Sequence, residues 1–125
     1  MTQPTVQFDH MAVDVRDLDA SARLIADLLG LAAPVPEGAD DDMLRIDLDH
    51  GAFILFTASP EPHPCHVAFR VAKPRFDAVA ERLRQKGIAF GNDPLDPTNE
   101  RLDDFRGGGR VYFHDADGHL WEVAC

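Results

Sequence analysis

Apolar positions recur along the first half of this chain with two different periods. Alternation of apolar and polar residues at its start is the pattern of a strand with one buried face. The next stretch carries an apolar stripe at helical spacing, with Asp17 or Asp19 as a candidate cap at its start and Gly30 at its end. The elements predicted here are a strand at 6–15, a helix at 18–29, a weak strand near Pro34 and Pro36, and strands at 43–48 and 52–57.

The second half repeats this order of elements. A strand at its start leads into a helix that contains Pro74, a residue favoured in a first turn, and that closes at Gly87. The segment Asp115-Ala-Asp-Gly118 predicts a tight turn between the last two strands. The elements predicted here are a strand at 65–71, a helix at 74–86, and strands at 88–90, 110–114 and 119–124.

The two halves read as copies of one unit. The segments that begin at His10 and His66 both have the pattern H-x-A-x-x-V, and each leads through a helix to a glycine. Each unit consists of a strand, a helix and three strands. The sequence therefore predicts an α+β fold of two βαβββ modules, 1–60 and 61–125, within a single domain of 125 residues.

The second unit is longer than the first by about 11 residues, which lie in the segment 92–109. This segment is rich in proline, aspartate and glycine and has no period of its own. Connections of this kind are often lids or binding loops and less often disordered. We interpret 92–109 as a lid, and the three glycines at 107–109 are a candidate hinge.

Alternation along the strands decides which side chains share a face of the sheet. If the apolar set packs against the helices, then His10, His66 and Glu122 all point to the opposite side. Several further polar residues fall on that side too: Arg45, Arg70, Arg110, Tyr112 and His114. A sheet with helices on one face and titratable groups on the other predicts a cup that binds a ligand.

Two imidazoles and one carboxylate are a standard ligand set for a divalent metal. They leave positions open for water or for a substrate that binds through its oxygens, and an open metal stabilises an enolate or alkoxide. Each residue alone has a plainer explanation, as a hydrogen-bonded histidine or a solvated carboxylate. The equivalent places of the two histidines in the repeat, with the glutamate on the same face, favour one metal site.

The composition narrows the classes of partner. The chain has 22 acidic and 12 basic residues and a net charge of −10. Such a surface repels the phosphates of nucleic acids, and no basic stripe offsets it. No charged and then apolar leader opens the chain, and no apolar run approaches the roughly 20 residues of a membrane span. We therefore expect a cytoplasmic protein without nucleic-acid or membrane partners, whose cysteines need not form a disulfide.

Four motifs together resemble the glyoxalase/bleomycin resistance protein/dioxygenase superfamily, also called the vicinal-oxygen-chelate superfamily. They are Asp9-His-Met-Ala-Val-Asp-Val-Arg-Asp-Leu18, Asp27-Leu-Leu-Gly30, His66-Val-Ala-Phe69 and Val111-Tyr-Phe-His-Asp-Ala-Asp-Gly-His-Leu-Trp-Glu122. The resemblance covers almost the whole chain and implies paired βαβββ modules. It places the metal residues at His10, His66 and Glu122, with one divalent ion of Mn, Fe, Zn, Ni or Co in each site.

The resemblance also implies an assembly and a function. In related small proteins two chains pair, so we expect a homodimer in which His10 of one subunit joins His66 and Glu122 of the other. The implied function is a metal-dependent enzyme, acting as a lyase, transferase or dioxygenase on a small oxygen-bearing substrate. The alternative is a small-molecule-binding protein without catalysis, like the relatives that sequester bleomycin and lack the metal ligands.

Departures from the family pattern limit what the resemblance implies. Leu55 stands where the first unit would need a fourth ligand, so the set resembles the sites of extradiol dioxygenases and fosfomycin-modifying enzymes. Tyr112 matches a substrate-pocket tyrosine of the fosfomycin thiol transferases, but Ala12 stands where those enzymes have a threonine. The roles we expect are catalysis by Tyr112 and Arg110 and substrate binding by Arg45, Arg70, Arg106 and His114.

The remaining histidines and the cysteine next to His66 have no expected catalytic role. His50, His63 and His119 flank turns or prolines, so we expect them to be solvated. Alternation turns Cys65 away from the face of His66, which predicts a buried thiol. The sequence leaves the substrate, the metal and the type of reaction open.

Overall fold

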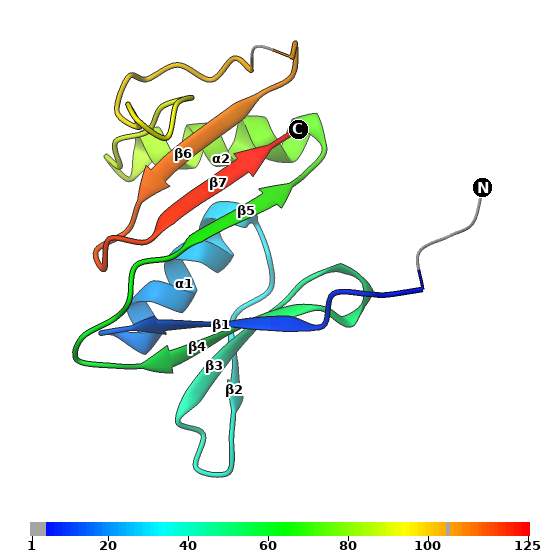
Figure 1. The fold of residues 1–125 in the computed structure, drawn as a ribbon, viewed down its shortest axis with the longest axis vertical. Coiled ribbons are helices and arrows are strands. Elements are labelled where there is room, and N and C mark those ends of the chain that lie inside the picture. Colours follow the sequence, from blue (N-terminus) through cyan, green and yellow to red (C-terminus); the bar gives the residue numbers. More distant parts are fainter. Residues whose placement is uncertain (1–4, 105) are drawn as a thin grey trace.

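The computed structural model describes residues 5–104 and 106–125, which form two sheets and two helices (Figure 1). The elements of the first half are β1 (His10–Val15), α1 (Leu18–Leu29), β2 (Val35–Glu37), β3 (Met43–Asp47), the short turn η1 (Asp49–Gly51) and β4 (Phe53–Ala58). Those of the second half are β5 (His66–Arg70), α2 (Lys73–Gln85), β6 (Arg110–His114) and β7 (Leu120–Ala124). The predicted α+β class is confirmed. Among the helices of the described residues, none is long and apolar enough to cross a membrane.

The first sheet has the strand order β1-β4-β3-β2, with β1 parallel to β4. Its helix, α1, begins where the side chain of Asp17 accepts a hydrogen bond from the backbone of Ala20, and it ends at Gly30 in the left-handed conformation. Two arginines of α2, Arg75 and Arg82, donate to the last carbonyls of α1. Both ends of α1 are therefore satisfied, and its C-terminus is fixed to α2.

The second sheet has the order β5-β7-β6 and lacks the strand that we predicted at 88–90. Gly91 makes only an isolated bridge with Tyr112. The chain then turns away from β6, because the side chains of Asn92 and Asn99 bond to each other at 2.8 Å. A Cβ atom at position 91 would lie 2.7 Å from Asn99, so only glycine permits this turn. The prediction of a strand here was wrong.

The repeat in the sequence has a counterpart in the pairing of the strands. In the first sheet His10 lies opposite Phe53, and in the second sheet His66 lies opposite Leu120. Both are the first residues of parallel pairs, β1 with β4 and β5 with β7. Each histidine therefore opens its unit at the same place in the sheet, as the repeat predicts.

One continuous core joins the two halves, with α1 and α2 on one side of the sheets (Figure 1). Trp121 of β7 is fully buried in it, and its ring stacks on those of Phe56 and Phe69 at 6.3 and 6.0 Å. Burial of a large apolar side chain contributes about 1.5–3 kcal/mol. Because Phe56 belongs to the first half, Trp121 packs across the boundary between the halves. The predicted alternation of the strands is confirmed on this apolar side.

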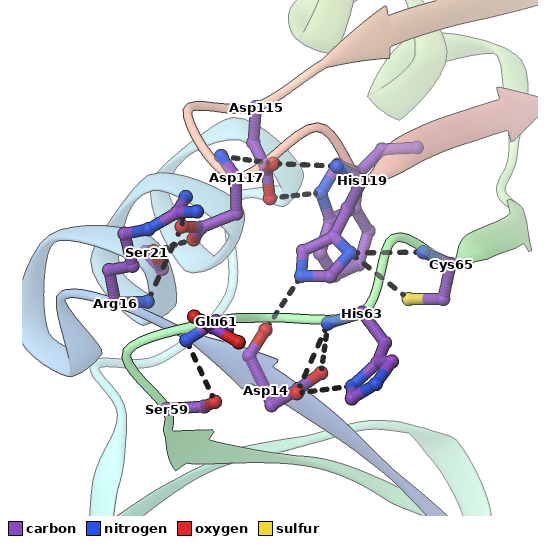
Figure 2. A network of polar contacts seen from close by, with 11 residues as sticks. Asp14, Arg16, Ser21, Ser59, Glu61, His63, Cys65, Asp115, Asp117 and His119 are labelled. Atoms are coloured by element: carbon purple, nitrogen blue, oxygen red, sulfur yellow. Dashed lines mark hydrogen bonds and ion pairs between the residues drawn. The ribbon is translucent and has the colours of Figure 1, made fainter.

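A buried histidine also joins the two halves (Figure 2). His119 lies just before β7, where its Nδ1 accepts the backbone N–H of Cys65 at 3.1 Å and its Nε2 donates to the carbonyl of Asp14 in β1 at 2.7 Å. The prediction that His119 is solvated was wrong, because the turn before β7 packs it against β1. His50 and His63 are exposed as predicted. The free thiol of Cys65 is half-buried, and burial raises its pKa.

Candidate metal centre

His66 and Glu122 meet on the open face of the second sheet. They lie on neighbouring parallel strands, and Nε2 of His66 is 2.7 Å from Oε1 of Glu122. The side chain of Glu122 is 8% exposed, whereas that of His66 is half exposed. A buried carboxylate requires partners that compensate its charge. The structure therefore brings together two of the three predicted metal residues.

Arg110 holds the other oxygen of Glu122. Its Nη1 pairs with Oε2 of Glu122, and its Nε donates to Asp104 at 2.8 Å. The bond with Asp104, more than that with Glu122, raises the pKa of Arg110. The pKa of Asp104 is lowered, because the backbone of Arg106 and then the guanidinium of Arg110 donate to it. Sequence reasoning missed Asp104, since it lies in a segment without a period and no local pattern places it beside β6.

Tyr112 lies opposite Glu122 in the antiparallel pair of β6 and β7. It is buried, and its ring centroid is 6.0 Å from that of His66. Burial, and then the negative charge of Glu122, raise the pKa of Tyr112. The phenol is therefore neutral at physiological pH and is able to donate a hydrogen bond.

A cavity of about 590 Å³ lies beside Arg110 and Tyr112. The segment 92–109 contributes most of its wall, including Arg101 and Arg106. Of the residues predicted to bind substrate, Arg106 is thus placed next to the predicted catalytic pair. The interpretation of this segment as a lid stays a prediction.

The glycines at 107–109 have a packing role that the sequence did not indicate. A Cβ atom at Gly109 would lie 2.5 Å from the ring of Phe76, and one at Gly108 would lie 2.5 Å from the carbonyl oxygen of Cys125. Residues with side chains would force these neighbours apart. Close contact with α2 and with the end of β7 therefore explains two of the three glycines.

His10 stands on β1 of the first sheet. Its ring stacks on Phe53 at 4.6 Å, and its Nδ1 is 2.5 Å from a carboxylate oxygen of Asp9. These contacts orient the ring and leave Nε2 without a hydrogen-bond partner in the part of the chain that the structure describes. Within one chain, His10 forms no metal-binding group with His66 and Glu122 among the described residues. Carboxylates commonly orient metal-binding histidines in this way, a role that sequence reasoning did not assign to Asp9.

The other predicted substrate residues are spread over the molecule. Arg45 forms ion pairs with two carboxylates of the first sheet at 2.7 and 2.8 Å and lies over Phe53, the ring on which His10 stacks. Arg70, at the end of β5, lines a second cavity of about 520 Å³ near the end of α1. His114 is exposed at the end of β6. None of Arg45, Arg70 and His114 lines the cavity of 590 Å³.

The turn between β6 and β7 holds a further group of side chains that metals bind. Ligand atoms of Asp115, Asp117 and His119 lie within 4.8 Å of one another, the one such group of three in the described ranges. All three already have partners (Figure 2): Asp115 accepts the backbone N–H groups of Asp117 and His119 at 2.9 Å, and Asp117 pairs with Arg16 at 3.0 Å. These bonds shape the turn and fix it to the start of α1. The same bonds explain why the three side chains lie close together.

The separation of His66 and Glu122 is compatible with a divalent metal. Two donors that each lie about 2.1 Å from one ion, at right angles, are about 3 Å apart. The observed 2.7 Å between Nε2 and Oε1 is close to this separation. A neutral imidazole and a carboxylate suit Fe, Mn, Zn and related ions, and the half-exposed ring of His66 would leave an ion held there open to solvent.

The comparisons with known proteins agree with this fold. The family described as Glyoxalase/Bleomycin resistance protein/Dioxygenase superfamily matches residues 7–123. Comparison with curated proteins gives no match. Among solved structures, the chain is similar to "Oxidase ChaP-H1" with a TM-score of 0.88 and 35% identity, over 96% of this chain and 95% of that one.

Two further structures extend the likeness. "Oxidase ChaP-H2" has a TM-score of 0.87 and 31% identity, over 97% of this chain and 94% of that one. The fosfomycin resistance protein FosX from Listeria monocytogenes shares the fold at 18% identity and a TM-score of 0.69, over 98% and 92% of the two chains. Since the family matches nearly the whole length and the same fold recurs in these structures, this chain belongs to the glyoxalase/bleomycin resistance protein/dioxygenase superfamily.

Proposed function

We propose that this protein is a divalent-metal-dependent enzyme that acts on a small oxygen-bearing substrate. The metal residues of each site are His66 and Glu122 of one subunit and His10 of a second. The observation that carries the proposal is the contact of 2.7 Å between His66 and the buried carboxylate of Glu122, beside Tyr112 and a cavity of about 590 Å³. A metal held there acts as a Lewis acid on the oxygens of a bound substrate.

The separation of His10 from the other two residues supports a site that two chains share. His10 has an oriented ring and an Nε2 atom without a partner in the described residues, on the open face of its own sheet. His66 has the equivalent position on the second sheet, and Glu122 lies beside it on the neighbouring strand. Pairing of the first sheet of one subunit with the second sheet of another would unite the three. A two-fold symmetric dimer then contains two equal sites.

The residues around the pair have separate tasks in this proposal. The neutral phenol of Tyr112 donates a hydrogen bond to a substrate oxygen, and the cavity walled by the segment 92–109 holds the rest of the substrate. Arg110 compensates the charge of buried Glu122. Oxidation is the reaction class that we favour, because "Oxidase ChaP-H1" and "Oxidase ChaP-H2", to which the chain is 35% and 31% identical, are both named oxidases.

Metal content tests the proposal directly. Wild-type protein reconstituted with Mn, Fe, Zn, Ni or Co should contain one ion per chain, and His66→Ala or Glu122→Gln should lose it. His114→Ala is the matched control, because His114 is an exposed histidine on the neighbouring strand β6. Unchanged metal in the two site variants contradicts the proposal, and wild-type protein that takes up no metal favours a binding protein instead.

Mixed subunits test whether two chains share each site. The variants His10→Ala and Glu122→Gln should each have no intact site as homodimers. Random exchange of equal amounts should restore about one quarter of the sites, because half of the dimers then contain one intact site of two. No recovery of metal after exchange, together with a monomeric mass in solution, contradicts the shared site.

Activity assays of the metal-reconstituted protein with three kinds of substrate then identify the reaction class. Catechols, adducts of 2-oxoaldehydes with thiols, and epoxides represent oxidation, isomerisation and ring opening. Oxygen uptake with a catechol-like substrate supports the favoured class. Turnover of an adduct or an epoxide without oxygen uptake assigns one of the others.

A further inference from the structure

We propose that Asp104 is a positioning residue for the metal centre, because it fixes the carboxylate of Glu122 through Arg110. This inference rests on the proposed function. It assigns to the segment 92–109 a role that the sequence did not indicate, which is to hold one of the metal residues in a geometry that can bind an ion.

Asp104 is itself held firmly. Its side chain is 5% exposed, and its carboxylate accepts the backbone N–H of Arg106 and the Nε of Arg110, each at 2.8 Å. Its own backbone closes a turn, donating to the carbonyl of Gly108 and accepting from Gly107, each at 2.9 Å. The carboxylate therefore has a fixed place relative to the β6 strand that follows.

Arg110 transmits this position to Glu122. Its guanidinium contacts Asp104 with Nε and Glu122 with Nη1, and its backbone N–H donates to the carbonyl of Leu102 at 2.8 Å. The guanidinium is planar and rigid, so a fixed Nε also fixes the direction in which Nη1 points. Arg110 is only 20% exposed, which leaves its side chain little freedom to turn.

The arrangement divides the two oxygens of Glu122 between different partners. Oε2 is taken by Arg110, and Oε1 faces His66, where the metal would be held. Arginine pairs most strongly with a carboxylate when it binds both oxygens at once. Without Asp104, Arg110 could turn and take Oε1 as well, in competition with the ion. Asp104 prevents this because it occupies the Nε atom of the same guanidinium.

A purely structural role for Asp104 in folding its turn predicts something different. Loss of the carboxylate would then lower the stability of the protein but would leave the metal affinity of the folded molecules unchanged. Metal affinity and stability therefore have to be measured separately on the same variants.

The test uses the absorption of bound Co²⁺, which reports the ligands of the ion without any substrate. Asp104→Asn should weaken Co²⁺ binding by about 10- to 100-fold, the range typical of residues that orient metal ligands. Asp103→Asn is the matched control, since Asp103 is in the same segment but is exposed, and its carboxylate makes only long contacts in the described residues, with Asn92 at 3.4 Å and with Arg101 at 3.6 Å. Affinity of Asp104→Asn equal to that of Asp103→Asn overturns the inference.

Two additions separate this inference from the proposed function. If Asp104→Asn does not fold, Arg110→Lys takes its place. This variant keeps Asp104 in its turn but removes the guanidinium that contacts the carboxylates of Asp104 and Glu122 at once. If wild-type protein gives no Co²⁺ signal, the proposed function fails, and urea midpoints of metal-free Asp104→Asn, Glu122→Gln and the double variant decide the inference. Non-additive shifts of the midpoint support the coupling of Asp104 to Glu122, and additive shifts overturn it.

Discussion

Replacement of His119 by phenylalanine should destabilise the protein strongly, although no catalytic role is assigned to this residue. His119 is fully buried, and both of its ring nitrogens bond to backbone atoms, Nδ1 to the N–H of Cys65 and Nε2 to the carbonyl of Asp14. Only the neutral ring with its proton on Nε2 makes both bonds. Phenylalanine has a similar size and shape but can make neither.

The expected loss follows from the two groups that are left behind. Each buried backbone group without a partner costs about 1–3 kcal/mol, so the two together cost about 2–6 kcal/mol. Whole domains are stable by only about 5–15 kcal/mol. The variant should therefore lose a large fraction of its stability, and it loosens the contact between β1 and the turn before β7.

Urea unfolding at a fixed protein concentration measures this loss, because a protein that forms dimers changes its apparent stability with concentration. His114→Phe is the control, since it makes the same chemical change on β6 at an exposed position, where about 0.5 kcal/mol or less is expected. A loss for His119→Phe no larger than for His114→Phe would refute the argument that the two bonds of His119 hold the halves together.

Three further predictions concern the second sheet and the segment beside it. Gly109→Ala should lower the free energy of unfolding by about 1–3 kcal/mol, because its Cβ would lie 2.5 Å from the ring of Phe76; an unchanged urea midpoint contradicts this. The pKa of Asp104 is lower in the folded protein than its ordinary 3.8, so its stabilising effect is present above that pH and is lost as the pH falls through the folded pKa. Unfolding free energies of wild type and Asp104→Asn should then converge on acidification, and a constant difference speaks against it. Tyr112 is the single tyrosine, so an ultraviolet titration should give one transition above its ordinary 10.0, at a lower pH in Glu122→Gln; a wild-type transition at or below 10.0 excludes the raised pKa.

The strands and helices with a regular pattern of apolar residues were predictable from the sequence. Apolar residues at a fixed spacing determine which type of element forms and which of its faces is buried. Alternation predicted β1 and its faces, although the strand begins at His10 and not at position 6 as expected; Asp17, one of the two candidate caps, and Gly30 mark the ends of α1. The placement of His66 and Glu122 on one face followed from the same alternation, and their place in one metal site was implied by the family resemblance. These interactions are local or follow from the pairing of whole strands.

Contacts that depend on single hydrogen bonds outside the periodic elements were not predictable. Nothing in the sequence near His119 indicates that the carbonyl of Asp14 lies beside it, and so the ring was expected in solvent. The strand expected at 88–90 was lost to a turn that depends on the bond between Asn92 and Asn99. Distance along the chain explains the first case, because His119 and Asp14 are 105 residues apart. Asn92 and Asn99 are only 7 residues apart, but their bond joins side chains in a segment without a period, where no pattern predicts it.

The equal strand pairing of the two halves has a consequence for the number of donors that this scaffold can present. Ala12 lies opposite Leu55 in the first sheet as Ala68 lies opposite Glu122 in the second. Position 55 of the first sheet is therefore equivalent to position 122 of the second, but it carries an aliphatic side chain instead of a carboxylate. In a protein with this fold, a substitution at that one position would add a metal ligand without a change in the strand pairing. The two halves can therefore diverge in chemistry through single substitutions at equivalent positions.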